Sequence, residues 1–213
     1  MKISPTLTEV KEIAKTGKYD ILPVSCEILS DFITPIEAMR ILQNVSTHCY
    51  LLESAQANEA WGRYTFLGYD PKLEINCIDG HMKLGKLSVE TENPSEYIRQ
   101  ILSEYKSPKF DYLPSFTGGL VGYFSYDYLG YKEKSIRGKA RDTEDFKDVD
   151  LMLFDKVIAF DNLCQKIILI ANMSLDAPET GYNKAIVELK QLRELLMHGE
   201  KKQNMGGKSA SLS

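Results

Sequence analysis

The chain has 213 residues, with 26 basic and 30 acidic side chains and therefore a formal net charge of −4. Hydrophobic residues make up 43% of it and charged residues 26%, which is ordinary globular usage. This composition excludes a disordered chain, a collagen-like chain and a disulfide scaffold, and the mild acidity argues against a nucleic-acid-binding protein. The length suits one large domain or two small ones.

Cysteines, histidines and apolar runs give no sign of a metal site or a membrane segment. The four cysteines are too widely spaced for a zinc site, and we expect reduced thiols in a cytoplasmic protein. The three histidines fall in separate predicted elements, so we expect no metal ligands. No apolar run approaches the roughly 18 residues of a membrane span, and the N-terminus lacks the apolar core of a secretory signal.

The first third of the chain alternates between helical and extended patterns. Residues 7–15 have the spacing of a short amphipathic helix, and residues 19–29 read as extended. Thr34 and Glu37 can form a capping box around Pro35, which predicts a helix that runs to Gln43 with Ile36 among its inward residues. Three strands are predicted next, over residues 49–53, 63–69 and 72–78.

The remaining elements are hairpins and two further helices. Asp79-Gly80 predicts a turn into a strand at residues 82–84, and Asn93 starts a helix with Leu102 on its apolar stripe. Two strong strands at residues 151–160 and 166–171 form a hairpin, a helix covers residues 178–197, and residues 200–213 read as a flexible linker. Because the strands come in hairpin groups, we expect an α+β fold with mainly antiparallel sheet backed by helices.

Two segments depart from ordinary patterning. Gly118, Gly119 and Gly122 interrupt an aromatic and β-branched stretch, where glycine weakens a strand. They indicate positive φ, a bulge or close packing, either at a tight crossing between two sheets or at the wall of a site. Residues 131–150 carry a basic block followed by an acidic block, which is typical of a solvated loop and less often of an interaction surface.

A group of side chains with binding chemistry surrounds one predicted turn. Glu53 and Ser54 follow one strand and Arg63 opens the next, so a hairpin would bring a carboxylate, a hydroxyl and a guanidinium to one end of a sheet. That set is complementary to a zwitterionic amino acid. The alternative from the residues alone is a Glu53–Arg63 ion pair across the hairpin.

Three signatures, in order along the chain, resemble the N-terminal region of anthranilate synthase component I, a chorismate-utilising enzyme. They are Leu51-Leu52-Glu53-Ser54 with the Gly-Arg-Tyr-Thr-Phe-Leu-Gly run at 62–68, the stretch at 117–127, and Leu151-Met152-Leu153-Phe154-Asp155 with its hairpin. The resemblance implies two packed, mainly antiparallel sheets flanked by helices. It implies an N-terminal regulatory domain over residues 1–199, with the linker at 200–213 leading toward a C-terminal chorismate-binding half.

The resemblance also implies a function and a regulatory site. The full enzyme aminates chorismate and eliminates pyruvate to give anthranilate, with Mg²⁺ assisting and ammonia supplied by a glutamine amidotransferase subunit. Its chorismate and Mg²⁺ sites lie in the C-terminal half, so we assign no catalytic residue here and expect this chain alone to be inactive. The implied effector is L-tryptophan, with Ser54 as a contact, Leu52 and Glu53 beside it, and Arg63 matching a basic contact by position.

Two other interpretations stay open from the sequence. The nearest is the aminating subunit of aminodeoxychorismate synthase, in which bound tryptophan would be structural. The other is a non-catalytic amino-acid-binding module with no enzymatic partner.

Overall fold

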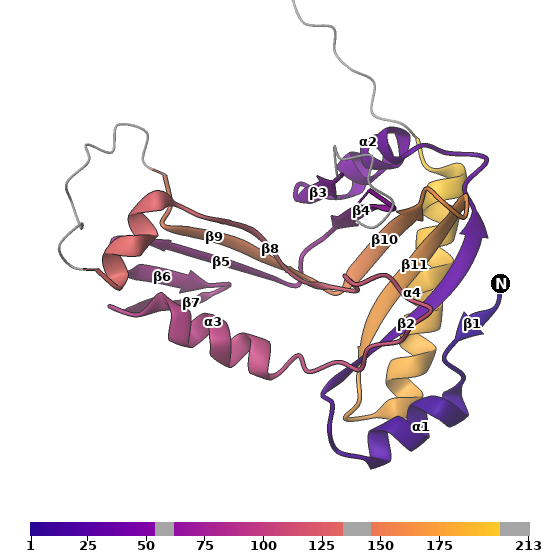
Figure 1. Cartoon of the computed structure of the whole chain (residues 1–213), viewed down its shortest axis with the longest axis horizontal. Helices are drawn as coiled ribbons and strands as arrows, with labels where there is room; N and C mark the ends of the chain where they lie inside the picture. The colour runs from indigo at the N-terminus through magenta and orange to yellow at the C-terminus, as the bar shows by residue number, and fades with distance from the viewer. Residues whose placement is uncertain (54–61, 134–145, 201–213) are drawn as a thin grey trace, which may run out of the picture.

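The computed structural model of the chain describes residues 1–53, 62–133 and 146–200. Within these ranges the helices are α1 (Leu7–Lys15), α2 (Pro35–Val45), α3 (Pro94–Ser103), α4 (Pro178–His198) and the short 3₁₀ helix η1 (Tyr126–Tyr131). No helix in this part of the chain combines the length and the apolar character that crossing a membrane requires. Figure 1 shows α1, α2 and α4 grouped around one sheet and α3 beside the other.

The strands form two antiparallel sheets. The first has six strands in the order β1 (Ile3–Ser4), β2 (Ile21–Leu29), β11 (Lys166–Ser174), β10 (Lys156–Asp161), β4 (Tyr64–Tyr69), β3 (Cys49–Leu52). The second has five strands in the order β7 (Leu87–Glu90), β6 (His81–Leu84), β5 (Leu73–Ile78), β9 (Val149–Phe154), β8 (Gly119–Phe124). The expected α+β class with mainly antiparallel sheets and flanking helices is confirmed.

The start of α2 is formed by the predicted capping residues, but two residues that were predicted to face the core, one in α2 and one in α3, are exposed. Thr34 caps α2, and Glu37 completes the predicted capping box. Ile36, in the first turn, is 54% exposed, because Ala38, Ile41 and Leu42 form the face that meets the core. In α3, Leu102 is likewise exposed and Ile98 is the buried apolar residue.

The predicted strand over residues 151–160 is in fact two strands that belong to different sheets. β9 ends at Phe154 in the five-stranded sheet and β10 begins at Lys156 in the six-stranded sheet. The carbonyl of Asp155 between them accepts hydrogen bonds from the backbone N–H and the side-chain amide of Asn172, at 2.8 and 3.0 Å. The first of these bonds continues the β10–β11 register, in which Lys156 lies opposite Ala171, so Asp155 is already held against β11 and the chain leaves the five-stranded sheet there. The predicted hairpin between β10 and β11 is confirmed.

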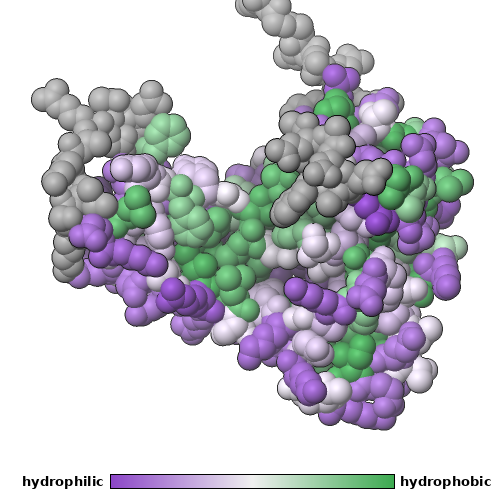
Figure 2. Space-filling model, in the orientation of Figure 1, coloured by the Kyte–Doolittle hydropathy of each residue, from purple (hydrophilic) through white to green (hydrophobic). Residues whose placement is uncertain are grey.

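The core is divided among three apolar clusters. One lies between the six-stranded sheet and helices α1, α2 and α4, and alternate β10 residues such as Ile158 and Phe160 point into it. The intervening residues Val157 and Ala159 point to the opposite face, into a cluster with Leu113. The third cluster joins the five-stranded sheet to α3 and η1. Figure 2 shows apolar surface gathered between the two sheets, which diverge in Figure 1.

The glycine-rich segment enters β8 close to its neighbours, as expected. Gly118, Gly119 and Gly122 have φ of 143°, 137° and 151°, a region that favours glycine. A Cβ on Gly122 would lie 2.0 Å from the carbonyl oxygen of Asp150. β8 itself stays in the five-stranded sheet in continuous register with β9, so it neither contains a bulge nor makes the crossing between the sheets. Most of the charged stretch over 131–150 lies outside the described residues.

Candidate functional site

The predicted hairpin forms and brings the candidate residues to one end of the six-stranded sheet. β3 and β4 pair antiparallel, with Leu51 opposite Leu67 and Leu52 opposite Phe66. Glu53 follows β3 and is exposed, and Arg63 immediately precedes β4. Ser54 lies outside the described residues, so its predicted role is untested.

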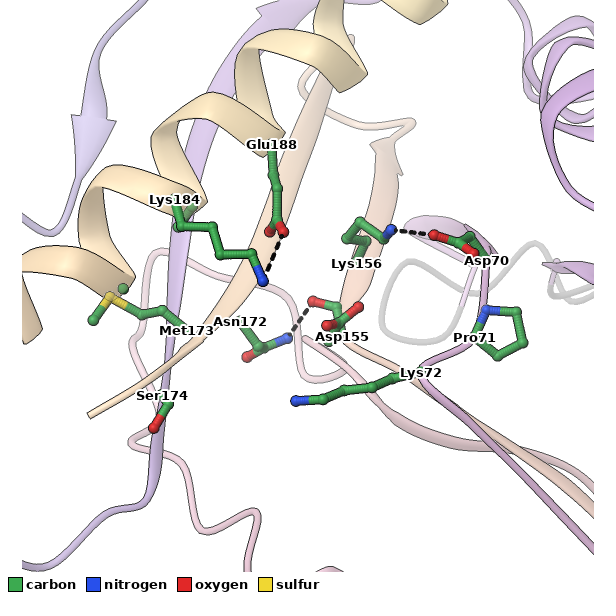
Figure 3. A pocket seen from close by; sticks show the side chains of 12 residues that line it. Asp70, Pro71, Lys72, Asp155, Lys156, Asn172, Met173, Ser174, Lys184 and Glu188 are labelled. Atoms are coloured by element: carbon green, nitrogen blue, oxygen red, sulfur yellow. Dashed lines mark hydrogen bonds and ion pairs between the residues drawn. The ribbon is translucent and has the colours of Figure 1, made fainter. Parts of the chain in front are cut away.

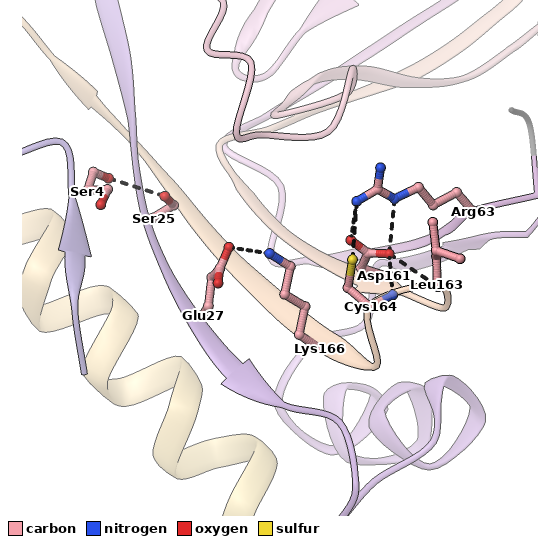
Figure 4. A network of polar contacts seen from close by, with 8 residues as sticks. All are labelled: Ser4, Ser25, Glu27, Arg63, Asp161, Leu163, Cys164 and Lys166. Carbon is pink, nitrogen blue, oxygen red and sulfur yellow. Dashed lines mark hydrogen bonds and ion pairs between the residues drawn. The ribbon is translucent and has the colours of Figure 1, made fainter. Parts of the chain in front are cut away.

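Arg63 contacts a carboxylate that the sequence did not indicate. Its Nε and Nη2 donate to the two carboxylate oxygens of Asp161 at 3.0 and 2.7 Å, which is a two-pronged contact (Figure 4). The Glu53–Arg63 ion pair considered from the sequence is therefore replaced by an Arg63–Asp161 pair. The reason is topological: β4 has β10 as its second neighbour, and Asp161 ends β10 directly opposite Tyr64.

Asp161 is a buried carboxylate, and both of its oxygens accept hydrogen bonds. Its side chain has no exposed surface, and Oδ1 also accepts the backbone N–H groups of Leu163 and Cys164 at 3.2 and 3.0 Å. Burial alone would raise its pKa, but the bonds from Arg63 and Cys164 outweigh it and lower the pKa of Asp161 to about 2. The same pairing raises the pKa of Arg63, so both groups are charged at neutral pH.

The Arg63 guanidinium is fixed on one edge and open on the other. Its Cζ lies 4.9 Å from the centroid of the Tyr64 ring, a cation–π contact that adds to the Asp161 clamp. About a third of the side chain, 35%, is exposed, and Nη1 has no hydrogen-bond partner among the described residues. A guanidinium positioned in this way can receive a second carboxylate at its free edge.

Aromatic and aliphatic side chains lie beside this cation. Leu52 is 46% exposed and pairs across the hairpin with Phe66. Phe66 contacts the Tyr64 ring at 5.8 Å and the Phe116 ring at 5.6 Å between centroids. The hairpin end therefore combines an anion-binding group with apolar surface, which suits the carboxylate and side chain of an aromatic amino acid.

Sequence reasoning found Leu52, Glu53 and Arg63 at this end but missed Asp161 and Tyr64. Asp161 falls in the connection between the strands predicted over residues 151–160 and 166–171, and nothing in the sequence links it to Arg63, 98 positions away. A metal site is not formed by the part of the chain that the structure describes, since no three His, Cys, Asp or Glu side chains converge there.

Comparison with known proteins finds relatives that share one protein name. No family model matches it. Anthranilate synthase component 1 of Acetivibrio thermocellus is 34% identical over 198 residues, which cover 90% of this chain and 39% of that protein. The Pseudomonas aeruginosa protein of the same name is 36% identical over 196 residues, covering 88% and 39%. A probable anthranilate synthase component 1 of Schizosaccharomyces pombe is 29% identical over 199 residues.

The fold is shared with a solved structure of the same enzyme. Anthranilate synthase component I from Streptococcus pneumoniae superposes with a TM-score of 0.50 and 25% identity, covering 78% of this chain and 36% of that one. The chain thus spans about two fifths of the length of the curated relatives it matches. The resemblance seen in the three sequence signatures is confirmed, and this chain is a homologue of the N-terminal region of anthranilate synthase component I.

Proposed function

We propose that this chain forms the N-terminal region of an anthranilate synthase component I and carries part of its L-tryptophan inhibitor site. The names of the relatives support the enzyme, which converts chorismate and ammonia to anthranilate, pyruvate and water. The proposal assigns chorismate and Mg²⁺ binding to a C-terminal region and ammonia supply to a glutamine amidotransferase subunit. These names favour anthranilate synthase over aminodeoxychorismate synthase.

One observation carries the effector site: the Arg63 guanidinium, clamped by Asp161 and stacked on Tyr64, at the end of the hairpin that also bears Leu52 and Glu53. In the proposed site the free edge of Arg63 binds the effector carboxylate and Glu53 binds the ammonium. Leu52 and the neighbouring rings contact the indole. The Ser54 hydroxyl supplies a further hydrogen bond.

Inhibition requires that tryptophan bind one conformation of the enzyme better than another. A coupling free energy of about 1–3 kcal/mol is typical, and it acts reciprocally on chorismate. The hairpin end adjoins Phe116, which leads into β8 of the other sheet, so an effector there can bias how the two sheets are arranged.

Titration calorimetry of this chain with L-tryptophan tests the proposal. We expect saturable binding that Arg63→Lys weakens about tenfold, because lysine keeps the charge but loses the two-edged geometry. Arg99→Lys, on exposed α3, is the matched control and should bind as the parent does.

A second assay examines inhibition in the complete enzyme. Ser54→Ala should relieve tryptophan inhibition with little change in uninhibited anthranilate formation. Absence of saturable binding to the chain, together with unchanged inhibition in Ser54→Ala, would reject the effector site while leaving the enzyme assignment to stand on turnover.

A further inference from the structure

A concave site lies where the two sheets meet, under α4. It has a volume of about 460 Å³, a size common for small-molecule sites. Its walls come from both chain crossings between the sheets, at Pro71-Lys72 and at Asp155-Lys156, and from the last residues of β11 and the inner face of α4 (Figure 3).

This junction pocket is separate from the hairpin end. β4 runs from Tyr64, beside Arg63, to Tyr69, next to the pocket residue Asp70. At about 3.3 Å per residue, these two ends of β4 are roughly 17 Å apart. A ligand in the junction pocket is therefore an addition to the proposed effector site.

Two pairs of charged groups at the pocket are already matched. Lys156 Nζ bonds Asp70 at 2.8 Å and lies 4.9 Å from the Tyr69 ring centroid. Burial opposes its charge, yet the bond to Asp70 and the neighbouring groups raise the pKa of Lys156 overall. Lys184 and Glu188 form a looser pair across one turn of α4, at 3.8 Å. The charges of these four groups balance within the two pairs. The other charged side chains that line the pocket are Lys72 and Asp155.

Lys72 and Asp155 are a cation and an anion that form no salt bridge among the described residues, although the Asp155 carboxylate also contributes to the raised pKa of Lys156. Among the described residues the Lys72 ammonium has a single contact, 5.5 Å from the Tyr105 ring centroid, and the Asp155 carboxylate has no hydrogen bond or ion pair. The Asn172 amide nitrogen is used by the carbonyls of Thr117 and Asp155, which leaves its oxygen free to accept. Figure 3 shows Lys72 extended toward Asn172 and Asp155 across the same hollow.

We propose that the junction pocket binds a free α-amino acid with a small side chain. Lys72 would pair with the ligand carboxylate, and Asp155 and the Asn172 oxygen would receive its ammonium. A zwitterion suits this site because it neutralises both unpaired charges at once, whereas a simple anion or amine would leave one of them unmatched. Such a ligand would touch both crossings and so bridge the two sheets.

Heteronuclear NMR titration of this chain with glycine and with L-serine tests the site. We expect saturable shifts at Lys72, Asp155 and Asn172, with affinity weakened at least tenfold in Lys72→Met and in Asp155→Asn. Both side chains lack structural bonds, so these variants should fold. Lys86→Met, an exposed lysine after β6, and Arg63→Lys should bind glycine as the parent does.

Succinate and ethanolamine, which each lack one of the two charges, separate the ligand classes. Binding of either one as tight as that of glycine overturns the zwitterion assignment. Absence of saturable shifts up to about 50 mM glycine or serine, or equal binding by the Lys72 and Asp155 variants, overturns the site itself. Arg63 is not part of the junction pocket. A failed glycine titration would therefore reject the junction pocket without bearing on the proposed tryptophan site, and the reverse also holds.

Discussion

Arg63 and Asp161 share a contact but not the same environment. The Asp161 side chain is fully enclosed, whereas about a third of the Arg63 side chain reaches solvent. A buried charge that loses its partner is costly, because burial removes it from water without compensation. A partly exposed guanidinium can instead be hydrated, so the two halves of the pair should respond differently to mutation.

We therefore predict that Arg63→Met destabilises the chain by about 3 kcal/mol and Asp161→Asn by about 2 kcal/mol. Arg63→Met leaves the buried Asp161 carboxylate without its guanidinium partner, whereas Asp161→Asn removes the buried charge and keeps a hydrogen-bonding side chain. Urea unfolding at pH 7 measures both. A larger loss in Asp161→Asn than in Arg63→Met would contradict this account of the pair.

The lowered pKa of Asp161 also predicts a dependence of stability on pH. Because the folded-state pKa of about 2 lies below the ordinary aspartate value of 3.8, the pair stabilises the fold above that ordinary value. This contribution, about 2 kcal/mol, disappears as pH falls from about 4 to about 2. Unfolding free energies of the parent and Asp161→Asn should accordingly converge over that window, and a constant difference would show that Asp161 is not the titrating group.

Strand β8 depends on glycine at one position far more than at another. Gly119 and Gly122 both have positive φ, but a Cβ on Gly119 would meet nothing closer than a Phe116 ring atom at 3.8 Å. On Gly122 it would collide with the backbone of β9 at Asp150. The pairing between β8 and β9 is thus possible at this spacing only without a side chain.

Comparison of Gly122→Ala with Gly119→Ala isolates this contact, since both substitutions carry a similar φ penalty. We predict that Gly122→Ala is the more destabilising by at least about 2 kcal/mol, because β9 must shift away from β8. Thermal unfolding followed by circular dichroism gives the difference. Equal losses in the two variants would mean that the close approach contributes nothing beyond backbone strain.

At the scale of the molecule, apolar surface gathers between the two sheets (Figure 2), and buried aromatic side chains join them beneath it. Tyr50 on β3 contacts Phe154 at the end of β9, at 4.7 Å between ring centroids, and Phe116 before β8, at 6.4 Å. Leu52 on β3 and Tyr123 on β8 are exposed apolar side chains, one on each sheet. Within the described residues the buried hydroxyl of Tyr50 has no hydrogen-bond partner, and burial raises its pKa. Apolar surface of this extent marks an interaction site.

We predict that this chain, studied alone, self-associates through that surface. Sedimentation should show concentration-dependent association that the double variant Leu52→Ser/Tyr123→Ser reduces, because it removes exposed apolar area from both sheets. Val187→Ser, on the exposed side of α4, is the control and should associate as the parent does. A monodisperse monomer at all concentrations would instead favour the free-standing amino-acid-binding module.

Local chemistry determined much of this fold. The capping box of Thr34 and Glu37 and the continuous apolar runs of β10 and β11 act over a few positions, so the sequence alone predicts α2 and that hairpin. The short strand β7 and the helix η1 were missed, since neither has a clear periodic pattern of its own. The three signatures also sufficed to identify the family, because their order along the chain is specific.

The sequence by itself determined most of the helices and strands, the antiparallel α+β class, the resemblance to anthranilate synthase component I and the end of the sheet where the candidate residues lie. Only the tertiary structure decided that residues 151–160 divide between two sheets, because the apolar runs before and after Asp155-Lys156 suit a strand in either sheet and the bonds that hold Asp155 against β11 come from the distant Asn172. Likewise it chose Asp161 over Glu53 as the partner of Arg63, since strand order sets which carboxylate lies within reach. Both choices depend on contacts between distant positions, which no local pattern encodes.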